Sequence, residues 1–203
     1  DVERSRGLGD VYKRQVGKNK FLIKADEKYE IRNSLQGKFQ AENIAIAIKC
    51  AEILSIEKEK IVNGIEKVEW PGRMEKIGNF LLDGCHNPHA IKAFVDSLAD
   101  FSYEKIIIIF GAMKDKKIDE MVKLLPEATY IATQCKANRA MPAEKIAEMG
   151  ARQGKRFIVA KDVEKAIKIA RKMAKKNDLI CIVGSLYLVG EARKILRKYE
   201  IAR

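Results

Sequence analysis

The feature that most constrains the fold of this 203-residue chain is a regular alternation of short apolar runs and longer amphipathic segments after residue 72. Strand-like apolar runs cover residues 79–82, 105–110, 129–133, 156–160 and 179–183. Segments with apolar residues at helical spacing cover residues 89–98, 118–125, 142–153, 163–175 and 188–198. Strands that alternate with helices form a mainly parallel sheet with helices on both faces. We therefore predict a Rossmann-like α/β domain over residues 71–203.

The residues before this alternation follow another pattern. Residues 1–15 show no apolar period and join residue 16 abruptly, so we expect a foreign, disordered extension. The next segment predicts a hairpin and two helices, with strands over 20–24 and 29–32 and helices over 41–54 and 58–68. The chain is thus divided into residues 1–15, residues 16–70 and the α/β domain.

Charge and hydropathy limit the partners that the chain can have. The net charge is +12, and residues 151–203 hold 15 Lys and Arg against 5 Asp and Glu. Such a surplus suits a nucleic-acid surface or the attraction of anionic small substrates. The lysines of residues 164–176 instead flank an Ala/Ile stripe with few aromatic residues between them, which favours a solvated helix face over a nucleic-acid partner. No apolar run approaches the roughly 20 residues of a membrane span, so no membrane partner is expected.

The cysteines indicate the compartment. Cys50, Cys85, Cys135 and Cys181 lie far apart, and no two of them form a C-x-x-C pair. This spacing is typical of reduced thiols in a cytoplasmic protein and does not favour a metal site.

The most informative stretch for function follows the first apolar run of the α/β domain. That run ends at Asp83, and Asn87-Pro88 then opens a helical pattern, with His86 in the loop between them. Open α/β sheets bind ligands at the carboxyl ends of their strands. These residues therefore form either a ligand site or a tight connection with a polar cap.

Four further motifs suit anionic or polar ligands. Arg73 follows a Pro-Gly dipeptide, and its guanidinium can bind phosphate oxygens in a bidentate manner. Ser185 lies at the start of a helix, where N–H groups and a hydroxyl can bind an anion. Lys114 and Asp115 follow the second strand, where they line a substrate crevice or form a loop in which Asp115 caps the next helix. Asn43 has an amide that can both donate and accept, or it is an ordinary helix-start residue.

Taken in order, these motifs resemble one family. The sequence Pro-Gly-Arg-Met-Glu precedes a strand and then Asp-Gly-Cys-His-Asn-Pro-His, and Gly-Ser-Leu-Tyr ends the last strand. An earlier Leu-x-Gly-x-x-Gln-x-x-Asn segment precedes both, although Phe39 stands where the family usually has His. The pattern is similar to the C-terminal part of folylpolyglutamate synthase/dihydrofolate synthase, a family of Mur-type ligases. The resemblance implies the C-terminal domain of such a ligase over residues 71–203 and the tail of its central ATPase domain over residues 16–70.

The resemblance also implies roles for single residues. Asn43, Arg73 and Asp83 match family residues that bind ATP. His86 matches a residue that contacts phosphate or orients the acyl intermediate, which makes it the candidate catalytic residue. Ser185 and Lys114 are the candidate substrate-binding residues.

The implied reaction is the ATP-dependent addition of L-glutamate to folate, to dihydropteroate, or to both, by a monomeric cytoplasmic enzyme. The chain has no Gly-x-x-x-x-Gly-Lys-Ser/Thr phosphate loop. In the family that loop and the Mg²⁺ ligands lie in the N-terminal ATPase domain, so we expect this chain alone to be inactive. Two other functions stay open, namely a Mur-type ligase of cell-wall precursors and a non-enzymatic nucleotide- or RNA-binding module.

Overall fold

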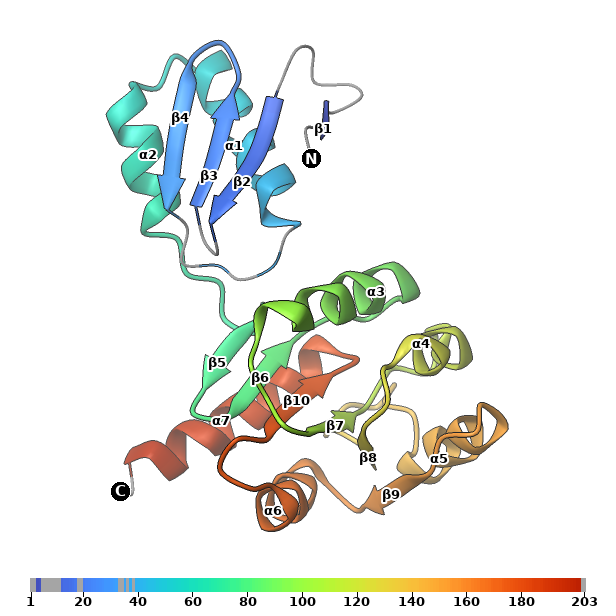
Figure 1. Cartoon of the computed structure of the whole chain (residues 1–203). Coiled ribbons are helices and arrows are strands. Elements are labelled where there is room, and N and C mark those ends of the chain that lie inside the picture. The colour runs from blue at the N-terminus through green and yellow to red at the C-terminus, as the bar shows by residue number, and fades with distance from the viewer. Residues whose placement is uncertain are drawn as a thin grey trace. The chain divides into compact units, whose positions relative to one another are not determined.

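The computed structural model describes residues 3–4, 12–17, 20–32, 35, 37 and 39–201. Its chain divides into two units, Asp1–Pro71 and Gly72–Arg203, which Figure 1 shows and which are described separately here. The assignment of the first unit to the tail of an ATPase domain stays a prediction.

The first unit is an antiparallel sheet covered by two helices. Its strands pair in the order β1-β2-β3-β4, and they are β1 (Glu3–Arg4), β2 (Tyr12–Gly17), β3 (Lys20–Lys24) and β4 (Lys28–Arg32). The helices are α1 (Gln40–Ile53) and α2 (Lys58–Glu66). Buried and exposed residues alternate along β3 and β4, because successive side chains of a strand point to opposite faces. The buried strand residues Phe21, Ile23, Tyr29 and Ile31 form one core with the helix residues Ala41, Ile44, Ala45, Ile48 and Ile61.

Strand β2 corrects one prediction from the sequence. Residues 3–4 and 12–15 were expected to be disordered, yet both belong to strands, and Tyr12 and Gln15 pair with Lys24 and Phe21 of β3. The segment has no apolar alternation, so only its backbone pairing with β3 makes it a strand. The rest of residues 1–15 lies outside the described residues, and the foreign origin of the segment stays a prediction.

The second unit is a six-stranded sheet in the order β5-β6-β10-β7-β8-β9. The strands are β5 (Glu75–Ile77), β6 (Phe80–Asp83), β7 (Ile106–Phe110), β8 (Thr129–Thr133), β9 (Phe157–Ala160) and β10 (Leu179–Val183). All neighbours are parallel except β5, which pairs antiparallel with β6. The predicted α/β class is therefore confirmed, and only the short edge strand β5 has no counterpart among the predicted strands.

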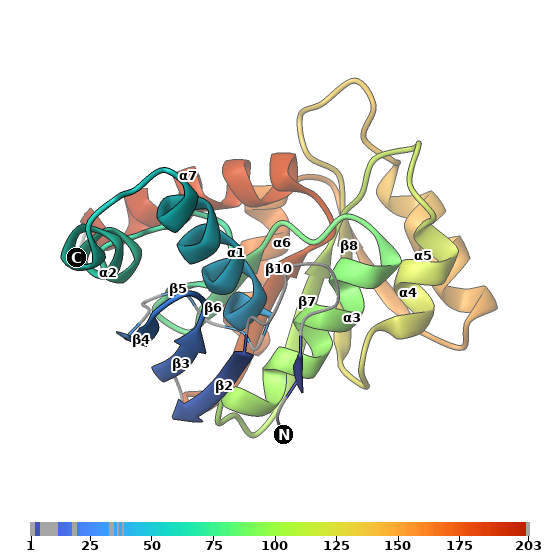
Figure 2. The same cartoon turned by 90° about the horizontal axis from the view of Figure 1, so that it is seen from above.

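Helices cover both faces of this sheet, as Figure 2 shows. They are α3 (Pro88–Ser97), with a 3₁₀ turn at Leu98–Asp100, α4 (Ile118–Leu124), α5 (Ala143–Arg152), α6 (Val163–Met173) and α7 (Leu186–Ile201). Helix α4 contacts both α3 and α5 on one face, and α6 contacts α7 on the other. Every second residue of the central strands, such as Leu82, Ile109 and Ile182, packs in one core with α6 and α7.

The three central strands end at the same level. Val183 of β10 is in register with Asp83 of β6 and with Phe110 of β7, and a glycine follows each strand. At Gly184 the backbone φ is +111°, and a Cβ atom would lie 2.6 Å from the carbonyl oxygen of Gly111. Glycine is therefore required where the strands leave the sheet this close together. Because β6 leads to α3 and β10 leads to α7 on the opposite face, the connections diverge here, which is where open α/β sheets bind ligands.

Candidate functional site

The candidate site lies at the carboxyl edge of β6, β10 and β7. Five of the six residues predicted from the sequence follow or adjoin these strands, and Asn43 belongs to the first unit. The geometry of each residue shows which tasks it already performs within the fold.

Asp83, the last residue of β6, is buried with 7% of its surface exposed. Its Oδ1 accepts the Cys85 N–H at 2.8 Å and its Oδ2 accepts the Met74 N–H at 3.0 Å. Burial raises the pKa of the Asp83 carboxyl above its usual value, and the two N–H donors and the charge of Arg73 oppose that shift. Asp83 thus ties its own loop to the segment that carries Arg73, a task that the sequence did not indicate. Its contact with ATP stays a prediction.

His86 is exposed in the loop that follows Asp83. Its Nδ1 lies 3.0 Å from the carbonyl oxygen of Gly84, and a carbonyl can only accept. We therefore assign the proton of the neutral ring to Nδ1, which leaves Nε2 as the atom that can accept a proton or bind a donor. The next residue, Asn87, caps α3 by accepting the Ala90 N–H at 2.8 Å, and Pro88 fills the first helical position, as predicted.

Ser185 lies between Gly184 and the start of α7. Its side chain is buried, and its Oγ accepts the Tyr187 N–H at 3.1 Å. The hydroxyl therefore caps the helix and keeps its own proton for donation. The next side chains, Leu186 and Tyr187, are 57% and 59% exposed. Binding of a substrate carboxylate by Ser185 stays a prediction.

Arg73 is exposed and lies between Gly72 and Met74, both of which have positive φ angles. Gly72 donates its N–H to Glu75 and accepts the N–H of Gly84 at its carbonyl oxygen, at 2.7 and 2.8 Å. The residue that precedes Arg73 is therefore held by hydrogen bonds at both its N–H and its carbonyl group.

Lys114 is exposed in the loop after β7, and its N–H donates to the carbonyl of Arg139 at 2.8 Å. Helix α4 begins at Ile118 without a side-chain cap. Asp115 instead pairs with Lys116 and with Arg139, and these charges lower the pKa of its carboxyl. The interpretation of Asp115 as a helix cap is therefore wrong, because Lys117 occupies the N-cap position of α4.

Asn43 is exposed on the first turn of α1, where its Nδ2 donates to the Oε1 of the buried Gln40 at 3.0 Å. This bond orients the amide and leaves its oxygen as an acceptor. Its contact with adenine stays a prediction.

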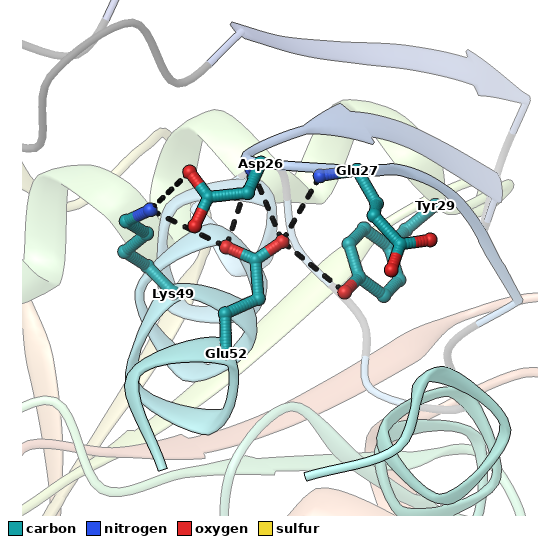
Figure 3. Close-up of polar contacts among 5 residues, drawn as sticks. All are labelled: Asp26, Glu27, Tyr29, Lys49 and Glu52. Atoms are coloured by element: carbon teal, nitrogen blue, oxygen red, sulfur yellow. Dashed lines mark hydrogen bonds and ion pairs between the residues drawn. The ribbon is translucent and has the colours of Figure 1, made fainter. Parts of the chain in front are cut away.

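A polar cluster that the sequence did not indicate binds the β3–β4 turn to α1 (Figure 3). Glu52 accepts the N–H groups of Asp26 and Glu27 at 3.1 Å and the hydroxyl of Tyr29 at 3.2 Å. Lys49 pairs with Asp26 and with Glu52. Burial and the hydrogen bond to Glu52 raise the pKa of Tyr29 to about 12. All of these donors satisfy one carboxylate, so the cluster stabilises the hairpin rather than forming an open ligand site.

Two negative findings apply to the described residues alone. They contain no helix that is long and apolar enough to span a membrane. They also contain no group of three or more His, Cys, Asp or Glu side chains that could hold a metal ion.

Comparison with known families adds the decisive observation. Residues 72–186 match the family described as Mur ligase, glutamate ligase domain. The chain belongs to this Mur ligase family. The match covers β5 to the start of α7 and so contains Arg73, Asp83, His86, Lys114 and Ser185.

The relatives of this Mur ligase domain are longer than the chain. A probable bifunctional folylpolyglutamate synthase/dihydropteroate synthase of Haloferax volcanii is 37% identical over 175 residues, which are 82% of the chain and 21% of the relative. A dihydrofolate synthase/folylpolyglutamate synthase of Bacillus subtilis is 30% identical over 191 residues, 87% of the chain and 44% of the relative. The chain therefore spans less than half the length of these relatives.

Further comparisons concern the fold and a second class of ligase. The folylpolyglutamate synthase of Mycobacterium tuberculosis, solved with ADP, shares the fold with a TM-score of 0.83 at 24% identity over 91% of the chain and 46% of that protein. A UDP-N-acetylmuramoyl-L-alanyl-D-glutamate–2,6-diaminopimelate ligase of Aquifex aeolicus is 30% identical over 78% of the chain and 35% of its own length. Both folate and cell-wall ligases thus contain this domain.

Proposed function

We propose that this chain is the C-terminal part of an ATP-dependent ligase that adds L-glutamate to folate, to dihydropteroate, or to both. The observation that carries the proposal is the match of residues 72–186 to the glutamate ligase domain of Mur ligases. Relatives with folylpolyglutamate synthase names support the folate substrate. We place this monomeric enzyme in the cytoplasm, where its partners are small molecules.

In the proposed reaction ATP phosphorylates a substrate carboxylate and ADP leaves. The amine of L-glutamate attacks the acyl phosphate, phosphate leaves, and an amide bond forms. Such phosphoryl transfer depends on positioning and on neutralisation of charge. Exclusion of water from the site protects the acyl phosphate from hydrolysis.

Three residues are proposed to bind ATP. The exposed guanidinium of Arg73 suits phosphate oxygens because it can donate two parallel hydrogen bonds. Asp83 keeps a second lone pair on each carboxylate oxygen for the hydroxyls of a ribose. Asn43 has its amide oxygen available for the adenine. This set supplies charge, acceptor and amide, which is the chemistry that a nucleoside triphosphate requires.

Three others are proposed to act on the substrates. The Nε2 atom of the exposed His86 is proposed to contact a phosphate or to orient the acyl intermediate. The Ser185 hydroxyl is proposed to donate a hydrogen bond to a substrate carboxylate, and the Lys114 ammonium group is proposed to form an ion pair with it. We propose that the ligands of the Mg²⁺ that accompanies ATP lie in the N-terminal ATPase domain, as the family resemblance implies. Because the sequence contains no Gly-x-x-x-x-Gly-Lys-Ser/Thr phosphate loop, we propose that the chain alone is inactive.

The test extends the chain at its amino end. The coding sequence upstream of Val16 is determined and the longer protein is expressed. ADP release is then measured with L-glutamate and either tetrahydrofolate or dihydropteroate. We expect pterin- and glutamate-dependent ADP release from the longer protein and none from the 203 residues alone. A start codon directly before residue 1, or activity of the 203-residue chain, would contradict the proposal.

A second candidate is a ligase of cell-wall precursors, which the Aquifex aeolicus relative supports. The Gly-Ser-Leu-Tyr segment at residues 184–187 favours the folate reading. The same ADP assay with a muramyl nucleotide in place of the pterin, and with 2,6-diaminopimelate as well as L-glutamate as the amine, distinguishes the two, because each ligase should turn over only its own substrates.

A further inference from the structure

We propose that Glu75 and Arg193 are positioning residues that hold residues 72–74, here called the entry segment, in the backbone conformation that presents Arg73. The entry segment opens the second unit, directly after Pro71. The functional consequence rests on the proposed contact between Arg73 and the phosphates of ATP.

The central contact is the carboxylate of Glu75. Its Oε2 accepts the N–H of Gly72 at 2.7 Å, and both of its oxygens accept the Nε–H of Arg193, at 2.8 and 2.9 Å. The side chains of Glu75 and Arg193 are only 17% and 25% exposed. Ion pairs that are this well shielded from water are screened less than exposed pairs. One carboxylate thus links the first residue of the entry segment to α7.

The entry segment has a backbone conformation that needs such support. Gly72 has a φ angle of +75° and Met74 has one of +48°. For Met74 this conformation brings Cβ close to a backbone oxygen, so it persists only where surrounding contacts impose it. The Met74 side chain is 1% exposed and therefore packs in the core. At Gly72 a Cβ atom would lie 2.8 Å from Cγ1 of Val189, also in α7.

The opposite side of the entry segment is bonded to the loop after β6. The carbonyl of Gly72 accepts the N–H of Gly84 at 2.8 Å, and the N–H of Met74 donates to Asp83 at 3.0 Å. Arg73 therefore lies between two residues whose backbone is held by hydrogen bonds. Gly72 is held through both its N–H and its carbonyl, and Met74 is held through its N–H. Removal of Glu75 breaks the ionic link to α7, whereas removal of Arg193 leaves only the longer and more exposed pair between Glu75 and Arg197, at 3.9 Å. Both changes leave the link to Asp83 and Gly84 intact.

Two variants with matched controls test the proposal in the 203-residue chain. Glu75→Gln and Arg193→Met remove the central pair. Glu164→Gln and Arg152→Met make the same changes in the exposed pairs Glu164–Lys168 and Arg152–Asp119. The measurement is amide hydrogen exchange by NMR, with the amides of β10 as a check that the sheet is intact.

We expect the Gly72 amide to exchange at least tenfold faster in Glu75→Gln and in Arg193→Met, while exchange in β10 stays unchanged. Neither control should alter the Gly72 amide. Unchanged exchange at Gly72 in both variants would overturn the proposal. Faster exchange throughout β10 would overturn it too, because the pair would then support the whole sheet and not the entry segment.

A titration with ADP separates this inference from the proposed function. The signal is the side-chain Nε–H resonance of Arg73, followed by NMR as ADP is added to the longer protein of the ADP-release assay, as the parent and with each substitution. We expect the two test variants to lose at least fivefold in ADP affinity at this resonance and the controls to match the parent. If the parent does not respond to ADP, the contact between Arg73 and phosphate is wrong. The exchange result then decides alone whether the pair holds the entry segment.

Discussion

Two turns of this protein are held by carboxylates that accept backbone N–H groups, one in each unit. In the first unit Glu52 holds the β3–β4 turn, and in the second Asp83 and Glu75 hold the entry segment. Among the described residues only Ser55 and Met74 have positive φ angles without being glycine, so the hairpin turn needs no such conformation and the entry segment does. Hydrogen bonds from backbone N–H groups to a carboxylate therefore stabilise an unstrained β3–β4 turn in the first unit. In the second unit the same kind of hydrogen bond holds the entry segment in a strained backbone conformation.

The largest effect should come from the strained backbone itself. In Gly72→Ala the new residue must adopt a left-handed φ, and its methyl group would lie 2.8 Å from Cγ1 of Val189. Because both the strain and the overlap destabilise the folded state, we expect a loss of about 3 kcal/mol in the free energy of unfolding. Urea denaturation measures it. The control is Gly64→Ala in α2, where a Cβ meets nothing within 4 Å; it should stabilise by about 0.5–1 kcal/mol. Equal effects at both glycines would remove the contrast between the units.

Asp83→Asn should follow in size. The amide that replaces one carboxylate oxygen would face a backbone N–H, and a buried donor left without an acceptor costs about 2 kcal/mol. Urea denaturation at neutral pH measures the loss. A loss within the error of the parent would show that the Asp83 carboxylate does not hold Met74 and Cys85.

The pH dependence of the same pair of proteins sharpens this result. Burial raises the folded-state pKa of Asp83 above its unfolded value, so the folded protein binds this proton more tightly than the unfolded chain does. The stability that comes from this proton is present at low pH. It is lost as the pH rises from the unfolded value, near 3.8, through the folded pKa. The stability advantage of the parent over Asp83→Asn should therefore shrink across that window in urea titrations. A growing advantage would mean that the folded-state pKa is lowered.

The smallest effect on stability should come from the relaxed turn. In Glu52→Gln the acceptors for the Asp26 and Glu27 N–H groups are neutral, and we expect a loss of about 1 kcal/mol. The more direct readout is the phenol of Tyr29, whose pKa of about 12 should fall toward 10. Ultraviolet titration of parent and variant, each minus its Tyr29→Phe counterpart, isolates this phenol. A Tyr29 pKa that stays near 12 in Glu52→Gln would assign the shift to burial alone.

Much of the second unit could be predicted from its sequence, because its central strands β7 and β10 are buried at every position and appear as continuous apolar runs. Strands β8 and β10 have the predicted bounds, and α3 begins where Asn87 and Pro88 indicated. Strands β2 and β5 could not be predicted in this way. Their residues carry no apolar alternation, and each is a strand because its backbone pairs with the strand that follows it, β3 or β6.

The candidate site divides in the same manner. Motif order alone selected Arg73, Asp83, His86, Lys114 and Ser185. The structure brings the last four to one edge of the sheet because the parallel strands β6, β7 and β10 present their carboxyl ends together. Arg73 lies at the same edge because β5, which it precedes, is antiparallel to β6. The helix-cap interpretation of Asp115 failed because α4 begins only at Ile118, with Lys117 at the N-cap position. Asp115 pairs instead with Lys116 and with Arg139, which is 24 residues away in the sequence.

By itself, the sequence determined the α/β class, the order of the elements and the ligase family, since these follow from local periodicity and from short motifs. Only the tertiary structure decided that Asp83 holds Met74, that Glu75 pairs with Arg193, and that Gly72 is enclosed by Val189. These contacts join residues up to 118 positions apart in the sequence. The physical reason is that the burial and pairing of a polar group depend on which segments contact each other in the folded chain, and local sequence patterns do not specify these long-range contacts.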